Sequence, residues 1–188
     1  KVTFSFKEGK AQAKKNTTIQ IQIQDNNRKP IEKFDITHTK KLHLIVVSKD
    51  LSFFSHIHPK YKGKGLFEIQ SHFPAGGEYK LFADFAPTGG VAITKSEWVK
   101  VEGQVTSPVP IQPDSKLTKS IDGKEITLSS DHFQTGKETM LTFTIKDDKT
   151  KKPITNLEAY LGAVGHVVIL NKDETKYLHV HPMDEKST

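Results

Sequence analysis

Apolar and polar residues alternate with a period of two along several short stretches of the chain. Within residues 18–24, Ile19, Ile21 and Ile23 are separated by glutamines. Because successive side chains of a β-strand point to opposite faces, this pattern predicts a half-buried strand. The same pattern predicts strands at residues 79–85, 98–101 and 141–146. No stretch keeps the i, i+3, i+4, i+7 apolar spacing of an amphipathic helix long enough to predict one.

Turn-forming residues separate the predicted strands. Glycine, asparagine and aspartate cluster at residues 25–27, 75–77, 88–90 and 146–148. These residue types tolerate or stabilise the backbone conformations of tight turns. Short strands separated by such turns are typical of antiparallel β-sandwiches, so we expect an all-β protein.

The second half of the chain repeats the first at an offset of 123 residues. Without a gap, residues 43–50 (HLIVVSKD) align with residues 166–173 (HVVILNKD). Further along, residues 54–59 (FSHIHP) align with residues 177–182 (YLHVHP). Histidines, an aspartate, a proline and the strand pattern therefore coincide in register, which indicates two tandem antiparallel β-sandwich domains.

A stretch without a strand pattern separates the two copies. Residues 103–119 contain three prolines and are predicted to form a semi-extended linker. The first domain then covers residues 1–102 and the second residues 120–188. The second copy has no counterpart of residues 66–102, so we expect its sandwich to be incomplete at its C-terminus. An incomplete sandwich exposes a strand edge, through which two chains could pair.

Composition narrows the classes of function. The 188 residues include nine histidines and no cysteine. The missing cysteine excludes a disulfide framework, a cysteine zinc finger, an iron–sulfur cluster, a thiolate nucleophile and a blue-copper site. The net charge is +6, but the lysines are scattered and not interleaved with aromatic residues. We therefore expect a solvated basic surface and no nucleic-acid partner. No apolar run approaches the roughly 20 residues of a transmembrane helix.

Six of the nine histidines belong to the repeated segment, three in each copy. They are His43, His56 and His58 in the first copy and His166, His179 and His181 in the second. If Ser48 pairs with Phe53 across the intervening turn, His43 lies opposite His58 and the strand alternation puts all three imidazoles on one face. They could then bind one metal ion about 2 Å from each nitrogen. A shift of one residue in this register would move His43 to the other face.

Ligand chemistry limits the choice of metal. Imidazole without thiolate suits Cu(II), Zn(II) or Ni(II), and we expect Cu(II) or Zn(II). His72, on the strand after the first motif, and Met183, shortly after His181, are additional candidate ligands.

Two further histidines, His38 and His132, have no counterpart in the other copy and are expected at the surface. The repeated aspartates, Asp50 and Asp173, are expected to form turns.

The same segments resemble a known family. Residues 42–51, 56–59 and 73–85 are similar to bacterial extracytoplasmic proteins of the YtkA-like and FixH-like kind. The resemblance implies an Ig-like or cupredoxin-like sandwich, an association with copper or another heavy metal, and another envelope protein as a partner. It also implies a secreted or lipid-anchored protein, whose leader or anchor would have been removed upstream of Lys1.

Three functions follow from these patterns. The first is extracytoplasmic binding of a divalent metal, in the first place copper, by a protein that is not an enzyme. The second is a structural or ligand-presenting Ig-like module whose histidines pack and close hairpins without a metal. The third is a zinc hydrolase with three histidine ligands, for which the motif offers no obvious general base.

Overall fold

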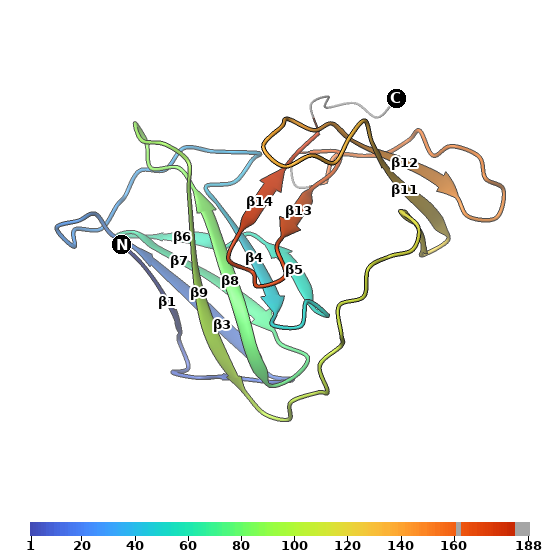
Figure 1. Ribbon diagram of the computed structural model, residues 1–188. Helices are drawn as coiled ribbons and strands as arrows, with labels where there is room; N and C mark the ends of the chain where they lie inside the picture. The colour runs from blue at the N-terminus through green and yellow to red at the C-terminus, as the bar shows by residue number, and fades with distance from the viewer. Residues whose placement is uncertain (161–162, 183–188) are drawn as a thin grey trace. The chain divides into compact units, whose positions relative to one another are not determined.

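The computed structural model describes residues 1–160 and 163–182 (Figure 1). Within these residues the protein is all-β, as predicted, and contains no helix. Accordingly, no helix in this part of the chain could span a membrane. The chain divides into two compact units. Unit 1 comprises Lys1–Ile111 and Ile169–Leu178, and unit 2 comprises Gln112–Val168 and His179–Thr188. Unit 1 thus includes a short segment of the predicted second domain.

Unit 1 is a sandwich of two sheets. The first sheet has the order β1-β3-β7-β6 and the second the order β2-β9-β8-β4-β5. The strands of the first sheet are β1 (Val2–Phe6), β3 (Asn16–Ile23), β7 (Leu66–His72) and β6 (Lys60–Gly63). Those of the second are β2 (Ala11–Gln12), β9 (Ile93–Glu102), β8 (Gly77–Phe85), β4 (Leu42–Ser48) and β5 (Phe54–Ile57).

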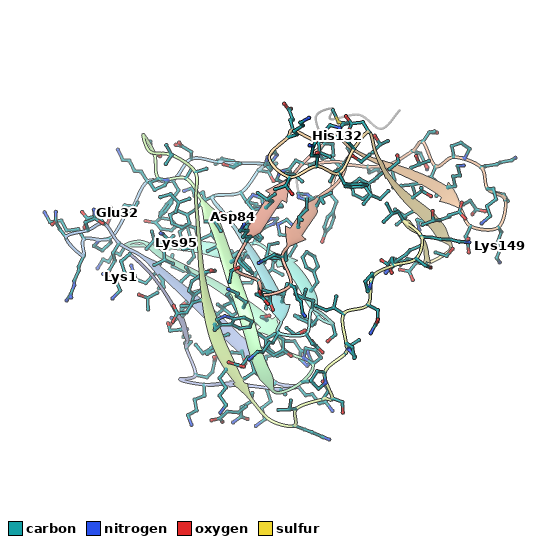
Figure 2. The ribbon with its side chains drawn as sticks, in the orientation of Figure 1. Lys1, Glu32, Asp84, Lys95, His132 and Lys149 are labelled. Carbon is teal, nitrogen blue, oxygen red and sulfur yellow. The ribbon has the colours of Figure 1, made fainter. Side chains whose placement is uncertain are left out.

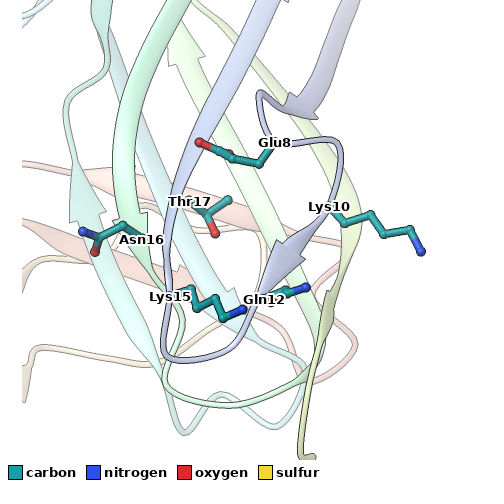
Figure 3. Close-up of a pocket in the computed structure, with 6 residues that line it drawn as sticks. All are labelled: Glu8, Lys10, Gln12, Lys15, Asn16 and Thr17. Atoms are coloured by element: carbon teal, nitrogen blue, oxygen red, sulfur yellow. The ribbon is translucent and has the colours of Figure 1, made fainter.

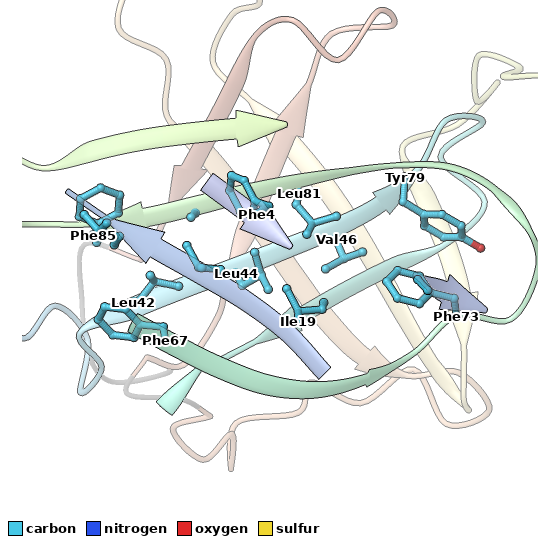
Figure 4. Packing of buried hydrophobic residues seen from close by; sticks show 14 of the residues in the cluster. Phe4, Ile19, Leu42, Leu44, Val46, Phe67, Phe73, Tyr79, Leu81 and Phe85 are labelled. Carbon is cyan, nitrogen blue, oxygen red and sulfur yellow. The ribbon is translucent and has the colours of Figure 1, made fainter. Parts of the chain in front are cut away.

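The core of unit 1 lies between these two sheets (Figure 4). Ile19, Ile21 and Ile23 of β3 contribute one side, as their alternation predicts. From the second sheet, Leu44 of β4 and Leu81 of β8 are fully buried against them. Burial of these apolar side chains is the main favourable contribution to folding of this unit.

Strand β4 is buried on both faces. Leu42, Leu44 and Val46 point into the core, whereas Ile45 and Val47 lie on the outer face and are also buried. A central strand that is buried on both faces consists of a nearly continuous run of apolar residues, and residues 44–47 form such a run.

The outer face of the same sheet carries contacts from the segment Ile169–Leu178 of unit 1. The ring of Tyr177 stacks on Phe82 of β8, with centroids 4.6 Å apart and planes 11° apart. The Tyr177 hydroxyl donates to a carboxylate oxygen of Asp84 over 2.6 Å. The backbone carbonyl of Glu174 accepts a hydrogen bond from Lys80. These contacts explain why this segment belongs to unit 1.

Unit 2 contains a three-stranded antiparallel sheet of β10 (Thr118–Ile121), β11 (Lys124–Ser130) and β12 (Leu141–Asp147). Strand β10 begins two residues inside the predicted linker. The strand predicted at residues 141–146 is present, but its Phe143 is 43% exposed. In the described residues no strand pairs with the second edge of β12, whereas β3 pairs with both β1 and β7. A separate hairpin joins β13 (Val167–Leu170) and β14 (Tyr177–Val180).

Candidate metal centre

The hairpin of β4 and β5 has the predicted register. Ile45 pairs with His56 and Leu44 with Ile57, so the next position along β4 places His43 opposite His58. The turn is closed by a hydrogen bond from the Ser48 amide to the Phe53 carbonyl. The alternation of β4 then puts His43 on the face turned away from the core, and the prediction that the three imidazoles share a face is confirmed.

Three imidazole nitrogens converge on this face. The Nδ1 atom of His43 lies 3.1 Å from Nε2 of His56 and 2.9 Å from Nε2 of His58. The ring centroids are 4.5–5.4 Å apart. His43 is 3% exposed, while His56 and His58 are half-buried. One ligand atom from each ring lies within 4.8 Å of the other two.

The spacing of these nitrogens fits a metal ion. With the metal–nitrogen distance of about 2.0–2.1 Å for histidine ligands, the two measured separations correspond to N–metal–N angles of about 90–100°. A neutral imidazole has only one acceptor lone pair, so Nδ1 of His43 has one lone pair to share between two neighbouring nitrogens. A cation at the centre would use all three lone pairs.

The other nitrogen of His43 is held by the backbone. Its Nε2 atom lies 2.8 Å from the carbonyl oxygen of Thr37. A carbonyl can only accept, so the proton of a neutral His43 ring sits on Nε2 and the lone pair on Nδ1 faces the other two histidines. Metal-binding histidines usually carry such an outer hydrogen bond, which fixes both tautomer and ring orientation.

Thr37 belongs to a tight turn just before β4. Thr37 and Lys40 exchange both backbone hydrogen bonds, at 2.9 and 3.1 Å. The two residues between them, His38 and Thr39, have φ angles of 46° and 70°. Two consecutive positive φ values in a two-residue loop are typical of a type I′ turn. The Thr37 carbonyl therefore accepts from both Lys40 and His43, and the turn positions the central histidine.

The second copy repeats the hairpin turn. Leu51 and Glu174, which are equivalent at the 123-residue offset, have φ angles of 57° and 53°. The Asn171 amide donates to the Lys176 carbonyl, as Ser48 does to Phe53. Two chemically different turns therefore adopt the same backbone conformation, which sets the same hairpin register in both copies.

The second set of histidines is also gathered. The ring centroids of His166, His179 and His181 are 4.5–5.8 Å apart. The Nε2 atom of His166 lies 2.7 Å from the carbonyl oxygen of Tyr160, which is the equivalent of Thr37. Tyr160 and Ala163 exchange two backbone hydrogen bonds, as Thr37 and Lys40 do. The outer hydrogen bond of the central histidine is thus present in both copies.

A carboxylate lies beside the first set. Asp84 of β8 pairs directly with His43 of β4 and is marked in Figure 2. Its two oxygens accept hydrogen bonds from Thr94 and Tyr177, each over 2.6 Å. Its charge favours a cation at the histidines. No motif in the sequence marks Asp84, although the alternation of residues 79–85 already puts it on the same face as Phe82 and on the opposite face from Leu81.

Of the two additional candidate ligands, His72 does not join the site. His72 ends β7 in the other sheet, opposite Asn16, and is exposed. His72 lies five residues before the start of β8, whereas His43 pairs with Asp84 near the end of that strand. The two histidines are therefore separated by about the length of β8. The expectation that His72 supplies a ligand is therefore wrong. Met183 lies outside the described residues.

The remaining histidines and aspartates differ in their surroundings. The Nδ1 atom of His132 lies 3.0 Å from a carboxylate oxygen of Asp131. His38 is exposed, as expected, but its ring centroid lies only 6.4 Å from that of His43. Asp50 forms its turn as predicted and accepts hydrogen bonds from the hydroxyls of Ser48 and Ser52 at 2.6 and 2.7 Å.

A polar pocket of about 330 Å³ lies elsewhere on unit 1 (Figure 3). Glu8 on its wall accepts a hydrogen bond from the Thr18 amide, and Lys10 forms an ion pair with Glu102. Asn16, opposite His72, also lines it, so the pocket lies at the far end of the sandwich from His43. Glu8 and Lys10 thus already have partners, and we assign the pocket no function.

Comparison with known proteins identifies a family without an assigned function. No curated protein and no solved structure shows significant similarity to the chain. A family described as a domain of unknown function, DUF8832, matches residues 1–103 and 119–188, which is most of the chain. The protein therefore belongs to the DUF8832 family.

Proposed function

We propose that this protein binds divalent transition-metal ions, with copper as the first choice and zinc as the second. The first site consists of His43, His56 and His58, and the second of the equivalent His166, His179 and His181. One observation carries the proposal. The Nδ1 lone pair of His43 faces two Nε2 atoms at 2.9 and 3.1 Å, while its Nε2–H is held by the backbone.

The ligand set favours Cu(II) over other ions. Imidazole nitrogens bind copper, nickel and zinc well, and Cu(II) forms the most stable complexes of the first-row divalent metals. No cysteine in the sequence could supply a thiolate. We propose binding without turnover, because Asp84, the carboxylate next to the first site, already accepts hydrogen bonds from Thr94 and Tyr177. A general base must instead be open to its substrate.

An extracytoplasmic location is also part of the proposal. It rests on the resemblance of residues 42–51 and 73–85 to secreted and lipid-anchored proteins of the YtkA-like and FixH-like kind. In that setting, another envelope protein would deliver the ion or receive it.

A structural role for the histidines is the second candidate. The contacts of His43 with Thr37, His56 and His58 could tie the hairpin to the preceding turn without an ion. In that case His43→Ala would lower the stability of the protein by the same amount in the presence and in the absence of metal.

Calorimetric titration of the purified protein with Cu(II) and Zn(II) separates these two functions. We expect two bound equivalents for the wild type and one for a His56→Ala/His58→Ala variant. His72→Ala is the matched control, because it removes an exposed histidine from the same unit, and it should keep both equivalents. Circular dichroism checks that each variant is folded. Heat that is absent, or that the double substitution leaves unchanged, would contradict metal binding at these residues.

A further inference from the structure

The turn that holds His43 also carries a fourth histidine. His38 is the first of the two central residues of this turn, next to Thr37. Its ring lies 6.4 Å from the ring of His43, at an interplanar angle of 77°. The ring–ring distances within the triad are 4.5–5.4 Å, so the His38 ring lies about 1–2 Å further from the His43 ring than the rings of His56 and His58 do.

The residues of this turn are unfavourable for its conformation. A type I′ turn prefers asparagine followed by glycine, because both central residues need positive φ. Here the central residues are His38, a residue type that tolerates positive φ, and the β-branched Thr39, for which positive φ costs energy. Such strain persists where another requirement keeps the residues in place, and it concentrates at ligand sites. Neither central residue is the asparagine or glycine that the turn itself favours, and the histidine among them is a residue type that can bind a metal.

Bringing the His38 ring to the ion would need a change of side-chain rotamer and no change of backbone. Its side chain is exposed, whereas the backbone on either side is held by the hydrogen bonds between Thr37 and Lys40. Rotation about χ1 and χ2 changes where an exposed imidazole ring lies. The backbone of the turn, and with it the anchor of His43, stays unchanged.

The second copy does not offer this ligand. At the 123-residue offset, the position of His38 is occupied in the sequence by Leu161, which has no metal-binding atom. A site with four protein ligands has no open coordination position, as in structural metal sites. A site with three protein ligands keeps one position for water or another molecule. The two copies would therefore bind metal differently.

We propose that His38 is the fourth ligand of the first metal site, so that this site is closed by protein ligands while the second keeps an open position. The inference rests on the proposed function. It assigns retention of an ion to the first site and exchange with external ligands to the second.

His38→Asn tests the role of this ligand. Asparagine suits a type I′ turn, so the metal-free variant should be at least as stable as the wild type. The variant is made in a His179→Ala/His181→Ala background, so that only the first site binds Cu(II). We expect at least a tenfold loss of Cu(II) affinity, since loss of an outer-shell partner alone costs 10–100-fold. Azide should shift the electron paramagnetic resonance spectrum of bound Cu(II) in the His38→Asn variant and not in its parent.

Thr39→Gly in the same background is the matched control, because it also favours the turn but keeps His38. Its Cu(II) affinity should equal that of the parent. Equal affinity and equal azide response of parent and His38→Asn would overturn the inference, while the proposed function would stand if His56→Ala/His58→Ala still abolished binding. Absence of Cu(II) binding in the parent would overturn both.

Discussion

The imidazole of His43 and the backbone carbonyl of Thr37 form the hydrogen bond that orients the candidate metal centre. The His43 Nε2 atom donates to the Thr37 oxygen over 2.8 Å, and His166 makes the equivalent bond to Tyr160 over 2.7 Å. Its recurrence in the second copy distinguishes this bond from a chance contact. Both central histidines thereby direct Nδ1 away from the carbonyl.

This geometry predicts the tautomer of the central histidines. In metal-free protein at pH 8, we expect His43 and His166 to carry their proton on Nε2, because a carbonyl accepts and cannot donate. Two-dimensional ¹⁵N–¹H spectra of the imidazole rings measure this directly. After Zn(II) addition, Nδ1 of His43 should shift, together with Nε2 of His56 and His58. A proton on Nδ1 of His43 in the metal-free protein would contradict the prediction.

Metal affinity should depend strongly on pH. A ring must be neutral to bind a metal, and an unperturbed imidazole has a pKa of about 6.5. Protons therefore compete with the metal below that pH, and affinity rises as pH increases. We expect the dissociation constant for Zn(II) to be at least about tenfold larger at pH 5.5 than at pH 7.5. Competition with a chromophoric chelator measures this, and an unchanged constant would argue against imidazole ligands.

Asp50 should stabilise unit 1 through its turn. Burial raises the pKa of this carboxyl, but hydrogen bonds from Ser48, the Val109 amide and Ser52 outweigh it and hold the pKa well below its usual range. The stabilisation is therefore present at neutral pH and lost as pH falls through the folded-state pKa. At pH 7, Asp50→Ala should lower the free energy of unfolding by about 1–3 kcal/mol.

Asp173→Ala provides the matched control for Asp50, because it changes the equivalent position of the second hairpin. Asp173 is exposed, and no hydrogen bond to its carboxylate is found in the described residues. We expect a loss below about 0.5 kcal/mol in urea denaturation. Hydrogen exchange at the Val109 amide should accelerate only in Asp50→Ala. Equal losses from the two substitutions would show that the hydrogen bonds of Asp50 do not matter.

Glu174 should make the protein less stable at alkaline pH. Its side chain is 1% exposed, and burial raises its pKa to about 7, although the charges of Lys80 and Lys49 act in the opposite direction and that of Asp50 adds to the rise. Because the folded state holds this proton to higher pH than the unfolded state, stability falls as pH rises from about 4.5 to 7.

Glu174→Gln removes that dependence. At pH 8 the variant should be more stable than the wild type by about 1–2 kcal/mol, a value reduced for solvent screening. At pH 4.5 the two proteins should have similar stability. Urea midpoints at both pH values give the comparison, and parallel curves for the two proteins would exclude a contribution from this carboxyl.

Truncation of the core should cost far more than truncation at the surface. Phe67 is fully buried, and its ring lies 5.0 Å from those of Phe34 and Tyr61. Phe67→Ala should lower the free energy of unfolding by about 3–5 kcal/mol. Phe54 of the same unit is 55% exposed, so Phe54→Ala should cost less than about 1 kcal/mol. Similar urea midpoints for the two variants would contradict the assigned core.

Local pattern was enough to predict several features of the protein. The alternation in residues 18–24 predicted β3 and its buried isoleucines, since side-chain direction in a strand follows directly from position. The turn between Ser48 and Phe53 set the register that brings His43 opposite His58. The 123-residue repeat extended the same hairpin to His166, because equivalent turns produce equivalent registers.

Other features depended on tertiary structure. The Thr37 carbonyl that orients His43 is a backbone group, which no residue type reveals. Sheet topology put Asp84 beside His43 and placed His72 in the other sheet, because neighbouring strands are chosen by the packing of the whole sandwich. The positive φ angles of the turn brought His38 close to His43. Strand period and turn chemistry act over a few residues and can be read from the sequence, whereas a metal centre needs groups from distant segments, which only the folded chain brings together.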